Sequence, residues 1–498
     1  MLSNWSKDIA LTPRQKGQSL SRQLAQSLEI MIENGKIQAG QPLPPVRKLA
    51  DSLSVNRGIV LSAYRILAEQ GRVTTHVGRG TRVSELPPNT SPHSSQGLSL
   101  PAWEAIGDLL SPPPYASLLA APYSFALASP DSRCVPAQAL ASLATEIIAK
   151  ESRTIFSYGP AQGDLGFRAQ VARSLRDEGL EVDANWVLPI SGATQAWDLV
   201  SRLFAAQDCV LLEDPCYPGA VRAFLARPQA IAWYPVGEEG ATLEHLEKAI
   251  VTRQARLLCI NPDFHNPTGN TLSIEARREV ARLARQYQLL ILEDGIFRDL
   301  NYDQERSYPP IFAFAPERTL LVSSFSKVLA PGLRLGTVVA TPGLVEKLGW
   351  LKQAMDYQTS TLSQAVVRAW MAKGWKEYLR TIQAVYRQKR DRLAAALRRE
   401  LPSEVHWREP EGGFFYWLSL PSSLDAENLL YQASHEGVAF LPGSFFGGGP
   451  GSTARWRHFL RLSFSAIATE SIEPGAALLG RILRERSGSE PTSAAPLF

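Results

Sequence analysis

The sequence predicts a multidomain chain: a small α+β head of three helices and a β-hairpin, then a large α/β body with a mostly parallel sheet and a smaller C-terminal lobe. Two patterns carry this prediction. Up to residue 83, apolar residues recur at helical spacing and are followed by a short alternating stretch. From residue 165 onward, short and nearly continuous apolar runs alternate with helical stretches. With 498 residues, 45% of them hydrophobic, the chain can build two or three separate cores.

The head is predicted to span residues 1–84. Apolar residues recur at helical spacing from Leu20 to Ile32, through VRKLADSL, and through SVNRGIVLSAYRILAEQG. The segment RVTTHVGRGTRVS then alternates like two short strands around a Gly-Arg-Gly tip. Helix, short helix, helix and hairpin together form one compact unit.

Charge is distributed unevenly between the head and the rest of the chain. Through residue 83 there are 12 Lys and Arg residues against 5 Asp and Glu, a balance of +7, whereas the remainder has 40 against 43, a balance of −3. A basic head on a mildly acidic body indicates an anionic partner for the head, and double-stranded DNA is the first candidate.

The remaining composition indicates a soluble, cytoplasmic protein. Residues 85–118 are rich in Ser and Pro and predict a linker, and residues 486–498 predict a flexible tail. The uncharged stretch from residue 109 to 130 contains five prolines, which exclude a membrane helix. The four cysteines lack CxxC spacing, which fits free thiols, and the seven histidines lack ligand spacing, so we expect no metal site.

The body is predicted to span residues 119–485, with a large lobe from about 165 to 350 and a small lobe from about 355 to 480. The apolar runs that predict its strands are WVLPI, CVLLED, ARLLCI, LLILED and TLLVSS. Polar motifs follow these runs directly. Since ligands of open parallel sheets bind beyond the carboxyl ends of the strands, we expect these motifs to converge on one crevice.

The segment SFSKVLAPGLRLG follows the last of these runs. A lysine at a strand end inside a pocket, Lys327, is suited to a Schiff base with an aldehyde cofactor, although an ordinary surface lysine is the alternative. Ser324 and Ser326 offer hydroxyl groups, and Arg334 could clamp a phosphate with two hydrogen bonds. Together these groups favour a phosphorylated aldehyde as the ligand.

Two further side chains suit the ring of such a cofactor. Asp294 ends the run LLILED, and a buried carboxylate there requires a cation such as a protonated pyridine nitrogen. A helix N-cap or a structural ion pair is the alternative role for this aspartate. Asn266 precedes Pro-Thr-Gly in a turn that can direct an amide toward a phenolic oxygen, although such a turn can also be purely structural.

Two more motifs complete the set. SGATQAWDLV opens a helix after a strand, so the amides of Ala193 and Thr194 are placed to bind a phosphate. LLEDPCYPG places Tyr217 where its ring could lie against a flat cofactor, although a lone tyrosine could equally fill the core.

In this order, the motifs SGATQA, EDPCY, NPTG, the aspartate after LLILE, SFSK with GLRLG, and LRLSFS resemble the fold-type I aminotransferases that depend on pyridoxal 5′-phosphate. The resemblance covers roughly residues 120 to 480. It implies that Lys327 forms the Schiff base, Asp294 pairs with the pyridine nitrogen, Asn266 bonds the phenolic oxygen and Tyr217 stacks on the ring. The phosphate would be held by Ser324, Arg334 and the amides of Ala193 and Thr194.

The same resemblance assigns two residues outside the cofactor ring. Arg461 in LRLSFS would bind the carboxylate of a substrate or effector. Tyr158 in YGPAQGDLGFR would reach the phosphate of the neighbouring subunit, which implies a homodimer.

One position departs from the family pattern. The family carries a tyrosine three residues after the aspartate, and this chain has Phe297. Loss of that hydrogen-bond donor to the phenolic oxygen should disfavour transamination without preventing cofactor binding. The alternative is that Tyr302 or another donor substitutes for it.

The head resembles the winged helix-turn-helix of the GntR family through PLPPVRKLADSLSVNRGIVLSAYRILAEQGRV and GRGTRVS. Arg47 can reach a backbone phosphate, and the start of the third helix faces base edges in the major groove. A basic helical module that binds another partner is the alternative. Asn56 stands where serine is usual and Gly58 where threonine is usual. The residues expected at DNA are Arg47, Asn56, Arg57, Gly58 and, in the wing tip, Gly78, Arg79 and Gly80.

A GntR-like head joined to an aminotransferase-like body resembles the MocR group of bacterial transcription regulators. This resemblance implies a DNA-binding regulator that captures pyridoxal 5′-phosphate on Lys327 and senses the cofactor or an amino compound. It further implies a head-to-tail homodimer at a double-stranded operator in the bacterial cytoplasm, associated with the nucleoid through its DNA. The alternative is a pyridoxal-phosphate-dependent aminotransferase with an attached DNA-binding head, and some residual activity of that kind is compatible with both.

Overall fold

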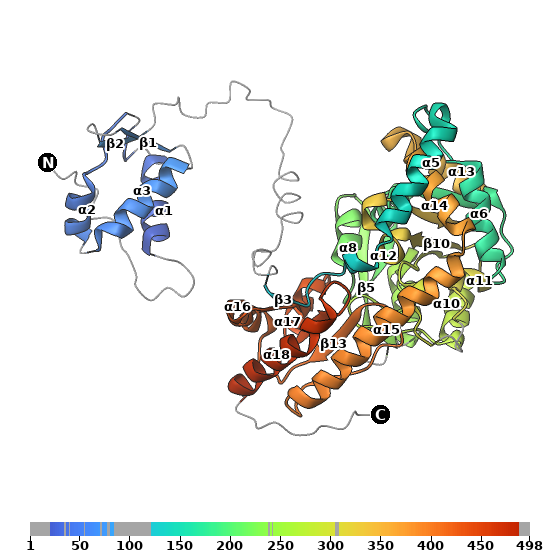
Figure 1. Ribbon diagram of the computed structural model, residues 1–498. Coiled ribbons are helices and arrows are strands. Elements are labelled where there is room, and N and C mark those ends of the chain that lie inside the picture. The colour runs from blue at the N-terminus through green and yellow to red at the C-terminus, as the bar shows by residue number, and fades with distance from the viewer. Residues whose placement is uncertain are drawn as a thin grey trace. The chain divides into compact units, whose positions relative to one another are not determined.

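The computed structural model describes residues 20–33, 36–38, 40–53, 55–69, 72–76, 80–83, 121–237, 240–241, 243–303 and 308–487. The chain divides into two compact units, residues 1–100 and residues 101–498 (Figure 1). The linker expected at 85–118, and the expected tail from residue 488 on, lie outside the described residues.

The head contains three helices and a two-stranded hairpin, as the sequence predicts (Figure 1). Leucine, valine and alanine side chains of the three helices pack with Tyr64, Val73 and Val83 into one small core. The hairpin is antiparallel, with Val73 opposite Val83. Its elements are α1 (Leu20–Glu33), α2 (Val46–Leu53), α3 (Arg57–Glu69), β1 (Val73–His76) and β2 (Gly80–Val83).

The body is built on an eight-stranded sheet with the order β4-β11-β10-β9-β8-β5-β6-β7. Strands β6, β5, β8, β9 and β10 are mutually parallel, whereas β11 is antiparallel to both of its neighbours and β7 is antiparallel to β6. The strands are β4 (Val187–Ile190), β5 (Cys209–Asp214), β6 (Ala230–Gly237), β7 (Gly240–Ala241), β8 (Ala255–Ile260), β9 (Leu290–Asp294), β10 (Thr319–Ser324) and β11 (Gly336–Val339).

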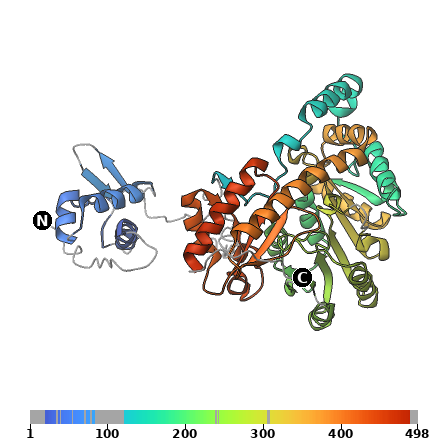
Figure 2. The ribbon, with the colours of Figure 1, turned by 60° about the horizontal axis from the view of Figure 1, so that its bottom comes forward.

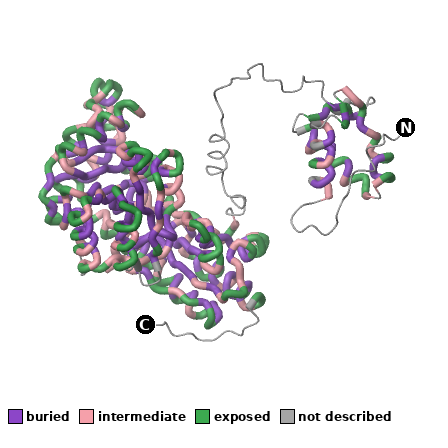
Figure 3. Tube along the Cα trace, turned by 180° about the vertical axis from the view of Figure 1, so that it is seen from behind, coloured by how far each residue is buried: buried purple, intermediate pink, exposed green. Residues whose placement is uncertain are grey.

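Helices cover both faces of this sheet, which explains why its strands are apolar on both sides. One face packs against α7 (Ala193–Ser201), α8 (Pro218–Leu225) and α13 (Pro342–Asp356). The other face packs against α9 (Leu243–Arg253), α10 (Ile274–Gln286) and α11 (Ile311–Phe314). Figure 3 shows the resulting layers, with buried chain at the centre of the body and exposed chain on the outer helices.

The small lobe contains a four-stranded sheet with the order β12-β13-β16-β15. Helices α15 and α18 pack side by side along it (Figure 2). Its strands are β12 (His406–Trp407), β13 (Phe415–Ser419), β15 (Leu441–Pro442) and β16 (Phe459–Ser463), and its helices are α15 (Trp375–Glu400), α16 (Ala426–Glu436), α17 (Ser452–Trp456) and α18 (Ile472–Ser487).

The remaining elements of the body are short strands, connecting helices and 3₁₀ turns. They are β3 (Tyr123–Ser124), β14 (Val438–Ala439), α5 (Ala137–Ile155), α6 (Leu165–Arg176), α12 (Phe325–Val328), α14 (Thr361–Ala372), η3 (Ser132–Cys134), η4 (Ala184–Trp186), η5 (Arg298–Leu300), η6 (Pro331–Leu333), η7 (Gly443–Phe446) and η8 (Thr469–Ser471). Within the described parts of the chain, no helix is long and apolar enough to cross a bilayer.

A segment of the body that we call the strap, residues 125–131, is fixed at both ends. Phe125 pairs through its backbone with Ala439 and Ser463, at 2.7 Å each. At the other end the ammonium group of Lys389 donates to Asp131 at 2.6 Å, and both side chains are buried. The middle residues of the strap are therefore held between one anchor on β14 and β16 and a second anchor on α15.

Candidate functional site

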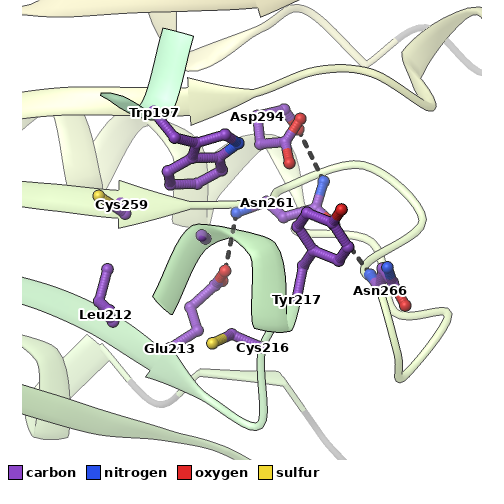
Figure 4. Close-up of a pocket in the computed structure, with 10 residues that line it drawn as sticks. Trp197, Leu212, Glu213, Cys216, Tyr217, Cys259, Asn261, Asn266 and Asp294 are labelled. Carbon is purple, nitrogen blue, oxygen red and sulfur yellow. Dashed lines mark hydrogen bonds between the residues drawn. The ribbon is translucent and has the colours of Figure 1, made fainter. Parts of the chain in front are cut away.

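The polar motifs predicted to converge do so at the carboxyl ends of β5, β8, β9 and β10. Because these four strands are parallel, their ends share one edge of the sheet. Asp294 is the last residue of β9, and Asn261 follows β8. Asn261, Asp294, Asn266 and Tyr217 line one pocket there, together with the thiols of Cys216 and Cys259 (Figure 4).

Lys327 lies on α12, directly after β10. Its Nζ donates to the carbonyl of Ala128 in the strap at 2.7 Å and lies 5.9 Å from the centre of the Phe297 ring. Burial, and after it the positive charge of Arg461, lower the pKa of Lys327 to about 8, while the negative charge of Asp294 opposes the change. The amine is thus partly unprotonated near neutral pH, the state in which it is a nucleophile.

Asp294 carries its carboxylate into the same pocket. One oxygen accepts from the amide of Ile296 at 3.3 Å, and no described cation lies within ion-pair distance of it. Burial raises the pKa of Asp294 to about 7, and the charge of Glu213 adds to the shift while Lys327 counteracts it. A ligand that brings a protonated ring nitrogen would supply the missing partner.

Arg461 on β16 joins the lobes and the strap. Its Nη1 donates to Oδ1 of Asn266 and its Nη2 to the carbonyl of Ala126, at 2.7 Å each. The guanidinium lies between the rings of Phe415 and Phe446, 4.4 Å and 4.9 Å from their centres. Burial lowers the pKa of Arg461 to about 9, and its buried Nε has no partner among the described residues. A carboxylate would match both the charge and this unused donor.

The bond from Arg461 also orients the amide of Asn266. Since Oδ1 of Asn266 accepts from Arg461, its Nδ2 group is left as the donor. This is the orientation that a phenolic oxygen requires.

A second group of donors surrounds the start of α7. Gly192, the N-cap of α7, has φ of +93°, and a Cβ there would lie 2.6 Å from Nη2 of Arg334. Arg334 itself is in the left-handed region with φ of +47° and donates to the carbonyl of Ser191 at 3.2 Å. The positive φ and the close approach of Arg334 both favour glycine at position 192, directly before Ala193 and Thr194 at the start of α7.

The two serines predicted near Lys327 have different roles. Ser324 accepts from the amide of Ser326 at 3.2 Å and caps α12. The hydroxyl of Ser326 is buried without a partner. A buried hydroxyl left unpaired one residue before Lys327 would suit a polar ligand group such as a phosphate oxygen.

Tyr217 is the N-cap of α8, and its ring folds back over Gly219. A Cβ on Gly219 would lie 2.3 Å from the ring, so a larger residue there would displace the ring from this position. Tyr217 lines the pocket together with Asn261 and Asn266, as Figure 4 shows. A flat ligand could lie against it.

Phe297 occupies the position where the family carries tyrosine. It is buried against Phe414 and Phe415, with ring centres 5.6 Å and 5.2 Å away. The hydroxyl of Tyr302 donates to the carbonyl of Gly413. Its donor is thus already used, and the structure gives no support to Tyr302 as the substitute.

Tyr158 is not brought to the pocket of its own chain. It is 84% exposed, and its ring packs against Tyr357 at 4.9 Å between centres. An assignment to a neighbouring subunit stays a prediction.

Sequence reasoning missed Asn261, which is buried and bonds to both Asp294 and Asn266. The available signal was an Asn-Pro pair at a strand end, five residues before the second Asn-Pro pair. Sequence reasoning also missed the contacts of the strap, because they are made by backbone carbonyl groups, which every residue carries and which no side-chain motif can indicate.

In the head, α2 and α3 form a helix-turn-helix. Arg47 on α2 and Arg57 at the start of α3 are exposed. Oδ1 of Asn56 accepts from the amide of Gly58 at 2.9 Å, so Asn56 caps α3 as a serine would. Gly80 opens β2, whereas the predicted tip residues Gly78 and Arg79 lie outside the described residues.

Comparison with known proteins finds two families in the chain. Residues 126–479 match the aminotransferase class I and II family, and residues 20–83 match bacterial regulatory proteins of the gntR family. The 2-aminoadipate transaminase of Thermus thermophilus is 36% identical over 367 residues, 72% of this chain and 90% of that protein.

Other relatives match over both parts. The uncharacterized HTH-type transcriptional regulator YdfD of Bacillus subtilis is 27% identical over 93% of this chain and 96% of its own length. Among solved structures, LysN, an alpha-aminoadipate aminotransferase from Thermus thermophilus complexed with N-(5′-phosphopyridoxyl)-L-leucine, has a TM-score of 0.70 at 34% identity. The match covers 77% of this chain and 97% of that one.

The environment of Lys327 predicts its titration. Amine labelling of the ligand-free protein, measured by mass spectrometry of the Lys327 peptide, should rise with pH around a midpoint near pH 8. Arg461→Met removes a cation and should move this midpoint upward, whereas Asp294→Asn removes an anion and should move it downward, each by about one pH unit. Exposed lysines in the same digest are the reference. Midpoints unmoved in both variants would contradict the electrostatic coupling.

Proposed function

Since this chain belongs to the class I and II aminotransferase family and carries a head of the gntR family, we propose that it is a DNA-binding transcriptional regulator that holds pyridoxal 5′-phosphate at Lys327 and senses the cofactor or an amino compound. The observation that carries this proposal is the full-length match to proteins named as HTH-type transcriptional regulators, which spans head and body together.

The described residues fit the cofactor at each of its polar groups. The buried hydroxyl of Ser326, with Ser324, Arg334 and the amides of Ala193 and Thr194, would hold the phosphate. Asp294 would pair with the ring nitrogen, Nδ2 of Asn266 would donate to the phenolic oxygen, and Tyr217 would lie against the ring. When bound, the cofactor supplies an aldehyde for amines and an electron sink.

The strap supports a sensing role for this site. Lys327 donates to Ala128, and Arg461 donates to Ala126, two residues apart. An aldehyde that bonds to Nζ of Lys327, and a carboxylate that takes Nη2 of Arg461, each compete with one of these carbonyls. The strap follows the head and linker in the sequence, so the ligand state of both side chains acts on the segment through which the chain enters the body.

A working aminotransferase with an attached head is the second candidate. The identity of 36% to a transaminase favours it. Phe297 opposes it, because one hydrogen bond to a charged group is worth about 1.5–3 kcal/mol, or roughly one to two decades in rate. Fast turnover of an amino acid with a keto acid would favour this candidate over the regulator.

The proposal includes the assembly and the cellular site. In a head-to-tail homodimer, the exposed Tyr158 would reach the phosphate of the neighbouring subunit. Two heads would bind two half-sites of one operator in the bacterial cytoplasm.

Cofactor capture is the first prediction of this function. Added pyridoxal 5′-phosphate should give the full-length protein a visible absorbance band, and borohydride reduction should fix the cofactor's mass on the peptide that contains Lys327. Lys327→Ala should abolish both signals, and Arg334→Ala should weaken binding roughly tenfold to a hundredfold. Lys373→Ala, at an exposed lysine, is the matched control. A wild-type protein that ignores the added cofactor would refute the cofactor assignment.

DNA binding is the second prediction. Arg57→Ala should weaken binding to duplexes selected by the wild-type protein by about 1–3 kcal/mol and relax their sequence preference. Arg47→Ala should weaken binding to all sequences alike and reduce the salt dependence by about one unit of slope. Arg256→Ala, at an exposed arginine of the body, should change neither. Unchanged affinity in both head variants would exclude α2 and α3 as the DNA-binding surface.

A further inference from the structure

The exposed face of α3 carries an apolar side chain that the proposed function leaves unused. Leu61 is 53% exposed, and within the described part of the head it is the only large hydrophobic side chain so exposed. The neighbouring Val60 and Tyr64 are buried in the core of the head. Leu61 therefore contributes little to that core and is available for a contact outside it.

Leu61 lies between two arginines on the same face of the helix. Arg57 is one turn before it and Arg65 one turn after it, both exposed and without an ion pair to any described residue. At 1.5 Å of rise per residue, about 6 Å of helix separates Leu61 from each of them. The small exposed residues Gly58 and Ser62 lie beside it. The face is thus narrow and positive, with one apolar group at its centre.

These properties match the major groove of DNA. The groove admits a helix, and its phosphates attract arginines on either side of the contact. Among the base edges in the groove, the C5-methyl group of thymine is the apolar group. The positive balance of the head, 12 basic against 5 acidic residues through residue 83, favours this occupant over an apolar protein surface.

We propose that Leu61 contacts the C5-methyl group of a thymine and thereby specifies thymine at one position of each half-site. The proposal rests on DNA binding by the head. The cap formed by Asn56 fixes the first turn of α3, so that Arg57 and Leu61 enter the groove in a fixed register. Arg57 reads a neighbouring base edge, and Leu61 reads the methyl group about one turn further along.

Deoxyuridine substitution tests the contact directly. Duplexes selected from random sequence by the full-length protein are resynthesised with deoxyuridine in place of each thymine in turn, which removes only the methyl group. At one thymine per half-site the wild-type affinity should fall about fourfold, the effect of one buried methyl group. Leu61→Ala should bind the thymine and deoxyuridine duplexes equally at that position.

Two variants control this experiment. Leu61→Met keeps an apolar side chain and should retain the preference for thymine, and Ser62→Ala should retain it at full size. The proposal would be overturned if no deoxyuridine substitution changed the affinity of the wild-type protein, or if Leu61→Ala kept the preference for thymine over deoxyuridine. A protein that selects no duplex at all would refute the proposed function instead.

A different observation carries a second inference, in the body. Asn261 is 8% exposed and bonds to the backbone of both predicted cofactor ligands. Its Nδ2 donates to the carbonyl of Asp294 at 2.7 Å, and its Oδ1 accepts from the amide of Asn266 at 2.8 Å (Figure 4). Its own amide donates to Oε2 of Glu213 at 3.0 Å. One residue, through its side chain and its backbone amide, thus connects the ends of β5, β8 and β9.

We infer that Asn261 is a positioning residue that sets the spacing between the carboxylate of Asp294 and the amide of Asn266. This inference rests on the proposed binding of pyridoxal 5′-phosphate. The ring nitrogen and the phenolic oxygen have a fixed separation, so both contacts form only when the two side chains are held apart by the matching distance. A strand end and a loop would otherwise move independently.

A double-mutant cycle on cofactor affinity tests this role. Asn261→Ala should weaken the binding of pyridoxal 5′-phosphate, measured by absorbance titration, about tenfold and shift the visible band. In the Asn266→Ala background, Asn261→Ala should weaken the affinity for pyridoxal 5′-phosphate less than about threefold. The distance between Asp294 and the side-chain amide of residue 266 no longer matters there, because that amide is absent. Thr359→Val removes a buried hydrogen bond to Pro189 elsewhere in the lobe and should lower thermal stability without this loss.

The outcomes separate positioning from stability. A tenfold loss that persists in the Asn266→Ala background, or cofactor affinity in Asn261→Ala within about twofold of wild type, would overturn the inference. If the wild-type protein binds no pyridoxal 5′-phosphate, the cofactor assignment itself fails.

Discussion

The buried guanidinium of Arg461 is the interaction on which the site depends. It comes from the small lobe, orients the amide of Asn266 in the large lobe, and holds the carbonyl of Ala126 in the strap. No described carboxylate lies within ion-pair distance of the guanidinium, so no paired anion neutralises its positive charge. That charge adds to burial in lowering the pKa of Lys327 to about 8. A single cation therefore connects both lobes, the strap and the nucleophilic amine.

The proposed function would require this site to bind a cofactor without rapid turnover. The groups suited to hold a phosphorylated ring are present, whereas the hydroxyl that the family places near the phenolic oxygen is replaced by the packed ring of Phe297. Binding and turnover have different requirements, since turnover needs donors that stabilise charge as it develops. Under the proposed function, the chain would retain the groups for the first requirement and lack one for the second.

Sequence patterns predicted the strands whose residues are uniformly apolar, together with the three helices of the head. They did not indicate β6, whose run AIAWYPVG contains a proline, or β11, whose GTVV follows a glycine-rich loop directly. In the candidate site, motif order predicted Lys327, Asp294, Asn266 and Arg334, because their side chains define the chemistry. Asn261 and the strap escaped prediction because they act through backbone groups, whose partners are set by tertiary structure and not by local pattern.

The two thiols that line the pocket have a consequence for the selectivity of its chemistry. Burial raises the pKa of Cys216 and of Cys259, and the nearby carboxylate of Glu213 reinforces the effect on both. A protonated sulfur is a poor nucleophile, so neither cysteine competes with Lys327 for an incoming carbonyl carbon. Burial, reinforced by Glu213, thus keeps both thiols protonated, whereas burial and Arg461 lower the pKa of the Lys327 amine. An electrophile that enters has one reactive partner among these three groups.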